Sequence, residues 1–130
     1  MNMIRKLPTP KEIKELYPLS DKIVETKKQR DKEIADVFTG KSNKFLLIIG
    51  PCSADKEEPV IDYISRLVPV QEQVKDKILI IPRIYTNKPR TTGEGYKGMI
   101  HQPDPTKHED MLEGLIKVRP VSYTHLRAHE

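Results

Sequence analysis

The chain has 130 residues, of which 36% are hydrophobic and 32% are charged, and its formal net charge is +4. This composition is typical of one soluble globular domain and excludes a disordered polar chain. No apolar run approaches the roughly 18 residues of a membrane span, and no apolar stretch of a secretory leader follows Arg5 and Lys6. We therefore expect a cytoplasmic protein, and the single cysteine, Cys52, agrees with a reducing compartment.

Residues 1–43 predict a helical extension that precedes the main fold. Three prolines within residues 1–19 indicate an arm with one short helical turn at residues 12–16. Residues 20–38 are highly charged and lack glycine and proline, and Gly40 follows them as a candidate C-terminal cap, so we expect a helix there. The apolar stripe of this helix is thin and consists of Ile23, Ile34, Val37 and Phe38.

The next segment predicts a strand, a helix and a second strand. Residues 45–49 and 78–81 are continuous apolar runs, as in parallel strands that are covered on both faces. Between them, Asp55 and Glu58 have the spacing of a capping box, and Pro69 predicts a kink. The helix has an apolar stripe of Val60, Ile61, Ile64, Leu67, Val68 and Val74. This order predicts a βαβ unit with a right-handed crossover, and hence an α/β fold.

A polar loop of about twenty residues follows, at residues 86–106. Loops of this length inside compact domains are commonly functional or disordered. We expect a third helix to begin near His108 or Asp110 and to be interrupted at Pro120. Its inward residues are predicted to be Met111, Leu112, Leu115 and Ile116.

Two side chains lie where the predicted strands end. Cys52 follows the first strand and Arg83 follows the second. Ligands of α/β folds bind at the carboxyl ends of strands, so both side chains could enter one binding site. The alternatives are that Cys52 is a buried packing residue and that Arg83 forms a surface ion pair.

The loop carries a second candidate site. Lys88, Arg90 and Thr91 combine two cations and a hydroxyl beside Pro89, which suits a phosphate monoester, and Lys97 adds a third cation. The alternative is a solvated basic loop.

Two further patterns are rejected as sites. Residues 93–98 match G-x-G-x-x-G, but they neither follow a strand directly nor open a helix, which excludes a dinucleotide site. His125 and His129 have the spacing of a helical metal pair, but the sequence around them argues against one.

Taken together, four motifs resemble the class I (α-type) 3-deoxy-D-arabino-heptulosonate 7-phosphate (DAHP) synthases over about residues 10–118. They are Gly50-Pro51-Cys52-Ser53-Ala54-Asp55, Pro82-Arg83-Ile84-Tyr85, Lys88-Pro89-Arg90-Thr91-Thr92 and Gly95-Tyr96-Lys97-Gly98. The resemblance implies a (β/α)8 TIM barrel that condenses phosphoenolpyruvate with erythrose 4-phosphate and releases phosphate, the first step of the shikimate pathway. It also implies a divalent metal ion of the Mn, Fe, Co or Zn type, acting as a Lewis acid.

The resemblance also implies residue roles. Cys52 would be a metal ligand, and Arg83 and Lys97 would hold phosphoenolpyruvate. Lys88, Arg90 and Thr91 would hold erythrose 4-phosphate, with Cys52, Arg83 and Lys88 at the catalytic centre. The extension would serve subunit contacts in a homo-oligomer and feedback inhibition by an aromatic amino acid.

The chain departs from the family pattern in four respects. Asp55 stands where some members have histidine, and residues 92–97 are one residue longer than in some relatives. A barrel of this type needs roughly 250 residues, so residues 44–118 would hold only about two of its eight strands. Residues 119–130 resemble a translated adapter and are predicted to be a foreign tail. We therefore expect the isolated chain to be inactive and prone to aggregation.

Three other functions are considered. A 3-deoxy-octulosonate 8-phosphate synthase shares the barrel but uses a pentose phosphate, and the motif at residues 88–92 favours erythrose 4-phosphate instead. The chain could also be a non-catalytic regulatory or binding module. A nucleic-acid binder is disfavoured because acidic residues are interleaved throughout the chain and no recognition helix is evident.

Overall fold

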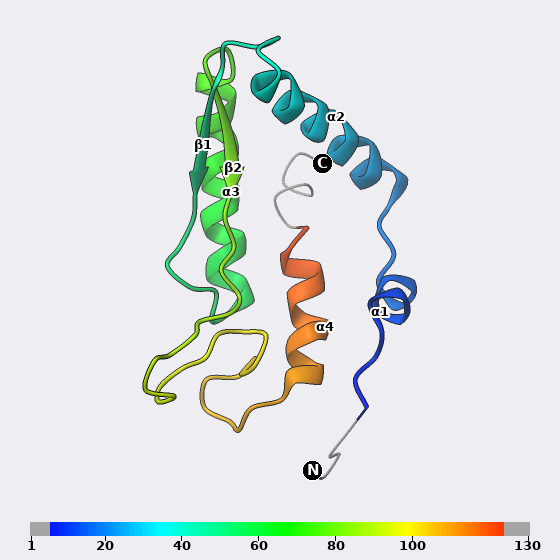
Figure 1. Cartoon of the computed structure of the whole chain (residues 1–130), viewed down its shortest axis with the longest axis vertical. Helices are drawn as coiled ribbons and strands as arrows, with labels where there is room; N and C mark the ends of the chain where they lie inside the picture. Colours follow the sequence, from blue (N-terminus) through cyan, green and yellow to red (C-terminus); the bar gives the residue numbers. More distant parts are fainter. Residues whose placement is uncertain (1–5, 124–130) are drawn as a thin grey trace.

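The computed structural model describes residues 6–123, which form an extension of two helices followed by an α/β unit (Figure 1). The elements in chain order are α1 (Pro10–Leu16), α2 (Asp21–Phe38), β1 (Phe45–Ile49), α3 (Glu57–Val74), β2 (Ile78–Pro82) and α4 (Met111–Val121). No helix within the described residues is long and apolar enough to cross a membrane.

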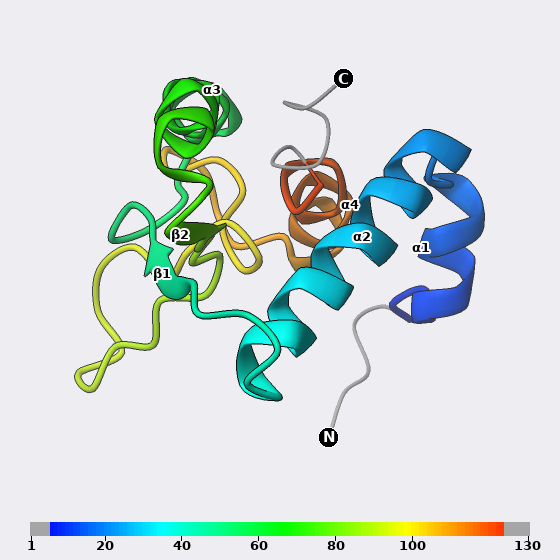
Figure 2. The ribbon, with the colours of Figure 1, turned by 90° about the horizontal axis from the view of Figure 1, so that it is seen from above.

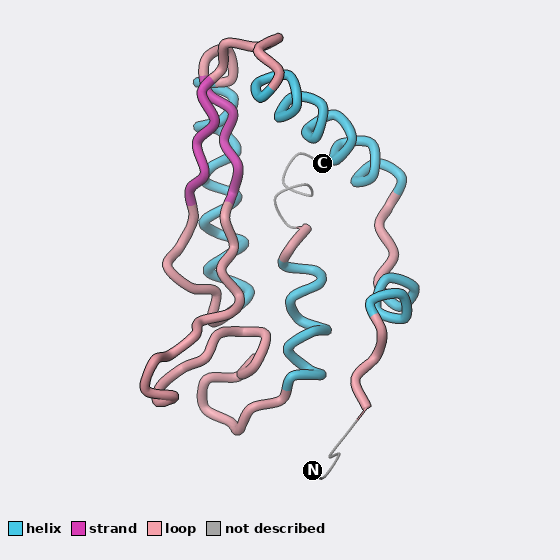
Figure 3. The backbone as a smooth tube through the Cα atoms, in the orientation of Figure 1, coloured by secondary structure: helices cyan, strands magenta, loops and turns pink. Residues whose placement is uncertain are grey.

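The predicted βαβ unit is confirmed. β1 and β2 are parallel, and Phe45 pairs with Ile78 while Ile49 pairs with Pro82. The crossover helix α3 packs against β2, and α4 lies beside α3 (Figure 2). The two strands therefore end on the same side of the molecule, where the loop after β2 begins (Figure 3).

A small core fixes this end of the sheet. It joins the segment after β1, the inner face of α3, the loop after β2 and the last turn of α4. Its buried members are Ala54, Val60, Ile64, Met99 and Val121, and Tyr63, Ile84 and Val118 pack against them. The loops that follow both strands are thus attached to the same apolar cluster.

The extension is helical, as predicted. Thr9 and Glu12 form a reciprocal capping box at the start of α1, which was not predicted from the sequence. Ser20 caps α2, and Gly40 follows that helix with a φ of 72°, which confirms its predicted role. Of the predicted stripe of α2, Ile23 is buried, whereas Phe38 is exposed.

The predicted capping box of α3 is wrong. The helix begins at Glu57, and Lys56 occupies the N-cap without a side-chain hydrogen bond. Ala54 is fully buried and donates its amide to the carbonyl oxygen of Tyr85 at 2.8 Å, which holds the chain extended past Asp55. Pro69 lies inside the helix without ending it, and Ile61 is more exposed than its place in the stripe predicted.

The predicted interruption of α4 at Pro120 is also wrong. Asp110 caps the helix as expected, but α4 continues through Pro120 to Val121. Val121 is buried in the core, and Ser122 donates its amide to Val118 at 2.9 Å, so the last turn is stabilised despite the missing N–H of proline. Met111, predicted to point inward, is exposed. The foreign origin of residues 119–130 stays a prediction, and residues 124–130 with both histidines lie outside the described part.

Candidate functional site

The candidate site lies where β1 and β2 end. Arg83 donates its backbone amide to Ile49 at 2.8 Å, so the two chain segments stay paired just beyond the strands. A Cβ at position 50 would lie 1.8 Å from the carbonyl oxygen of Arg83. Gly50 is therefore required for the close approach that brings residues 51–54 beside residues 83–85.

Cys52 is exposed in this structure and is not part of its apolar core. The Nζ atom of Lys88 lies 3.7 Å from its Sγ atom, although the two residues are 36 positions apart. The thiolate of a cysteine is the form that binds metals. The structure thus brings together two residues that the family resemblance assigned to one catalytic centre.

Arg83 lies beside the same segment. Its Nη1 atom donates to the carbonyl oxygen of Pro51 at 3.1 Å, and its guanidinium lies 4.5 Å from the ring centroid of Tyr85. Within residues 6–123 these contacts are to a carbonyl and an aromatic ring, and no carboxylate forms an ion pair with Arg83. The guanidinium is held near Cys52 and keeps N–H groups that could bind an anion.

The loop after β2 is closed by its own hydrogen bonds. Lys88 donates its amide to Lys97 at 2.8 Å, and the Nε atom of Arg90 donates to the carbonyl oxygen of Tyr96 at 3.1 Å. The Tyr96 hydroxyl donates to the carbonyl oxygen of Ala54 at 3.3 Å. Thr91 lies exposed in the turn of this loop. These bonds give the loop a defined conformation, although residues 89–95 are exposed.

Lys97 has a partner that the sequence did not reveal. Its Nζ atom lies 2.6 Å from Oε1 of Glu109, and the hydrogen bond and the charge of Lys97 lower the pKa of that carboxyl. The ammonium group is therefore bound to Glu109, two positions before α4, whereas Lys88 is the cation that contacts Cys52. Hydropathy and spacing gave no signal for this pair, because its members are 12 positions apart in an irregular loop.

The described residues do not supply a complete set of metal ligands. Among residues 6–123, no three His, Cys, Asp or Glu residues are grouped so that they could hold a metal ion. Cys52 could supply one soft ligand, whereas a protein metal site of this kind needs about three or more protein ligands. The described residues therefore offer one ligand and a set of cations, and not a whole metal centre.

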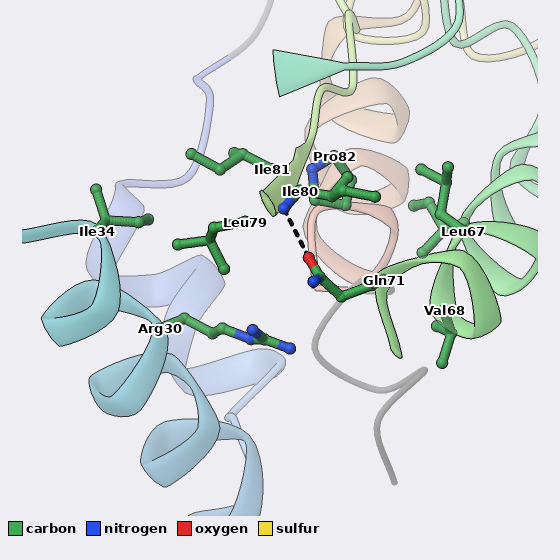
Figure 4. Close-up of a pocket in the computed structure, with 10 residues that line it drawn as sticks. Arg30, Ile34, Leu67, Val68, Gln71, Leu79, Ile80, Ile81 and Pro82 are labelled. Atoms are coloured by element: carbon green, nitrogen blue, oxygen red, sulfur yellow. Dashed lines mark hydrogen bonds between the residues drawn. The ribbon is translucent and has the colours of Figure 1, made fainter. Parts of the chain in front are cut away.

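A separate hollow lies between α2, α3 and β2 (Figure 4). Its volume is about 70 Å³, enough for a few water molecules rather than a phosphorylated sugar. Most of its lining is apolar, with Ile34 and Leu79 on one side and Leu67 on the other. This hollow does not compete with the strand ends as a substrate site.

Comparisons with known proteins agree on one family. The sequence profile of the DAHP synthetase I family matches residues 21–122. A phospho-2-dehydro-3-deoxyheptonate aldolase of Corynebacterium glutamicum is 36% identical over 115 residues, which cover 88% of this chain and 31% of that protein. The aldolase of the same name from Haemophilus influenzae is 42% identical over 89 residues, covering 68% of this chain and 24% of the relative.

A solved structure agrees with these matches. The phospho-2-dehydro-3-deoxyheptonate aldolase of Francisella tularensis superposes with a TM-score of 0.86 at 28% identity, over 98% of this chain and 38% of that one. The chain therefore spans about a third of the length of the relatives that it matches.

Proposed function

The chain belongs to the DAHP synthetase I family, and we propose that it is the N-terminal part of a DAHP synthase. Such an enzyme condenses phosphoenolpyruvate, erythrose 4-phosphate and water to DAHP and inorganic phosphate, the first step towards chorismate and the aromatic amino acids. The observation that carries the proposal is the cluster at the strand ends, where Lys88 lies 3.7 Å from Cys52 and Arg83 contacts Pro51.

The cations have a clear task in this reaction. Both substrates carry phosphate groups, and bringing two anions together is opposed by their mutual repulsion. Arg83 and Lys97 are proposed to bind phosphoenolpyruvate, and Lys88, Arg90 and Thr91 are proposed to bind erythrose 4-phosphate. Fixed guanidinium and ammonium groups would neutralise this charge and orient both substrates, which is a large part of what a bimolecular condensation needs.

Cys52 is proposed as one ligand of a divalent metal ion, whose remaining ligands would come from polypeptide beyond the described residues. Such an ion, when bound, polarises the aldehyde carbonyl of the acceptor. A thiolate ligand favours Mn, Fe, Co or Zn over magnesium. In a longer protein that carries this chain, Cys52→Ala should lower the bound metal measured by elemental analysis. Unchanged metal content would contradict the role of Cys52.

The fold and assembly follow from the same proposal. The βαβ unit would be the first part of a (β/α)8 barrel, with residues 1–43 as an arm for subunit contacts in a cytoplasmic homo-oligomer. Relatives from Escherichia coli and Enterobacter agglomerans are named Phe-, Tyr- and Trp-sensitive. We propose that one of these aromatic amino acids inhibits the whole enzyme.

The activity is tested in a longer protein that includes residues 1–122. Consumption of phosphoenolpyruvate is monitored by the decrease of its ultraviolet absorbance. It should require both erythrose 4-phosphate and a divalent metal. Turnover with a pentose phosphate instead would assign the alternative octulosonate synthase. Binding of an aromatic amino acid without any turnover would assign the non-catalytic module.

The 130-residue chain is expected to be inactive by itself, since no three candidate metal ligands are grouped among its described residues. A phosphate-release assay with both substrates and manganese measures this directly. Turnover above the rate of a Cys52→Ala control would show that the chain assembles a whole site without further polypeptide.

A further inference from the structure

Residues 88–97, which we name the cationic loop, behave as one closed unit. Lys88 and Lys97 are joined by a backbone hydrogen bond of 2.8 Å at its base. Inside the loop, Arg90 donates from Nε to the carbonyl oxygen of Tyr96 at 3.1 Å, and Gly93 donates its amide to Arg90 at 3.1 Å. Because these bonds lie within the loop, its position in the site is set by its contacts with other segments.

One group of contacts fixes the loop to its own flanks. Ile100 donates its amide to Thr86 at 3.0 Å. Gly98 has a φ of 94°, and a Cβ there would lie 2.4 Å from the same Thr86 oxygen. These contacts hold the base of the loop beyond β2, but they do not join it to the segment after β1 that contains Cys52.

Two side chains of the cationic loop reach that segment. Lys88 approaches Cys52 at 3.7 Å, and the Tyr96 hydroxyl donates to the carbonyl oxygen of Ala54 at 3.3 Å. Lys88 is itself a proposed substrate-binding group, so a bound anion would compete for its ammonium group. Tyr96 can hold the loop in place whether or not substrate is bound.

Ala54 is a firm anchor for such a contact. Its side chain is fully buried in the core, and its amide donates to the carbonyl oxygen of Tyr85 at 2.8 Å. It lies two positions after Cys52, so a group that is bound to its carbonyl oxygen stays near the thiol. Burial and the charge of Asp55 raise the pKa of Tyr96, and the phenol therefore remains a donor at neutral pH.

We propose that Tyr96 is a positioning residue whose hydroxyl holds the cationic loop against the end of β1, so that Lys88 and Arg90 are presented to the site beside Cys52. The substrate roles of Lys88 and Arg90 rest on the proposed function, whereas the attachment of the loop does not. Because its hydroxyl binds the carbonyl oxygen of Ala54, Tyr96 would act on the site through Lys88 and Arg90.

The attachment is tested on the 130-residue chain by limited trypsin digestion of Tyr96→Phe, which removes only the hydroxyl. Tyr63→Phe is the matched control, because this tyrosine packs on the same core from α3. Cleavage after Arg90 and Lys97 is compared with cleavage after Arg66 in α3 within each sample. Loss of one neutral hydrogen bond should raise the relative cleavage of the loop about 2- to 10-fold in Tyr96→Phe.

Two results would overturn the attachment. One is an unchanged cleavage ratio in Tyr96→Phe, and the other is an equal rise in Tyr63→Phe, which would indicate general loosening of the core. Because the ratio is internal to each sample, partial unfolding that affects all sites equally does not change it.

A kinetic measurement separates positioning from a merely structural role. In a longer enzyme that carries this chain, Tyr96→Phe should raise KM for the phosphorylated substrates about 2- to 10-fold with a smaller change in kcat. A fall in kcat at unchanged KM would refute the proposed positioning of the substrate-binding groups. If no form of the enzyme turns over, the proposed function fails, while the digestion result still decides the attachment.

Discussion

At position 50 the backbone leaves no room for a side chain, because a Cβ there would lie 1.8 Å from the carbonyl oxygen of Arg83. Gly50→Ala should therefore lower the free energy of unfolding by about 3 kcal/mol, as the strand ends are forced apart. Gly93→Ala is the control, since Gly93 has a φ of 74° with open space around it and should cost about 1 kcal/mol. Urea denaturation followed by circular dichroism measures both. Equal losses would contradict the steric explanation.

Asp104 provides a residue-scale prediction for pH. Hydrogen bonds from the side chain and backbone of Thr106, and then from Lys107, lower its pKa from 3.8 to about 2. Because the folded pKa lies below the unfolded one, the stabilising effect is complete above about pH 4 and is lost as the pH falls towards 2. Carboxyl carbon NMR should give a midpoint near 2 for Asp104 and a higher midpoint in Thr106→Ala, which removes the hydroxyl donor but keeps the backbone amide and Lys107. An ordinary midpoint in the unchanged chain would contradict the turn geometry.

The residues of the site were predictable to different degrees. Cys52 and Arg83 could be placed together because parallel strands end at one edge, and that rule needs only the two apolar runs. Glu109 and Tyr96 could not be found, because their partners depend on the path of an irregular loop. Loop paths are set by hydrogen bonds between distant residues, which have no periodic signature in the sequence.

At the scale of elements, Gln71 of α3 acts on the open edge of β2. Its amide donates to the carbonyl oxygen of Ile78 at 3.0 Å. Its Oε1 atom accepts the amide of Ile80 at 2.6 Å (Figure 4). At the two ends of β2, the carbonyl oxygen of Lys77 and the amide of Arg83 form hydrogen bonds to the β1 segment. Backbone groups of successive residues in a strand point to alternate sides, so those of Ile78 and Ile80 point away from β1. The side-chain amide thus occupies the positions where a further strand would pair.

Gln71→Leu should test this contact. The side chain is 5% exposed, so its loss leaves two backbone groups without partners in an apolar setting. We expect the free energy of unfolding to fall by about 1–3 kcal/mol and hydrogen exchange at the amide of Ile80 to accelerate. Gln73→Leu, at an exposed position two residues further along α3, should change neither. Unchanged exchange at Ile80 would contradict the contact.

The elements show where sequence patterns succeed and where they fail. Both strands were predicted from continuous apolar runs, which are typical of strands in parallel sheets. Helix ends were less predictable. The start of α3 is displaced by the buried Ala54, and α4 continues past Pro120 because Val121 is buried in the core. In both cases packing between distant segments overrides the local signal.

At the scale of the whole molecule, apolar side chains remain uncovered on β1. Phe45 is 67% exposed and Ile48 is 65% exposed, and within residues 6–123 no strand pairs with the outer edge of β1. An uncovered apolar strand with free backbone groups is a template for pairing with another chain. On β2 the amide of Gln71 covers the corresponding groups, so β1 is the more open of the two edges.

We therefore expect the isolated chain to self-associate through β1, and charge placed on this strand should oppose it. In sedimentation velocity, the unchanged chain should show a sedimentation coefficient that rises with concentration, whereas Ile48→Lys should remain monomeric. Leu16→Lys is the matched control, because Leu16 is 66% exposed on α1, away from the sheet. A monomeric parent chain, or equal suppression by both substitutions, would contradict association at β1. In a longer protein the same Ile48→Lys substitution should destabilise the fold, since any strand that covers β1 would then bury a charge.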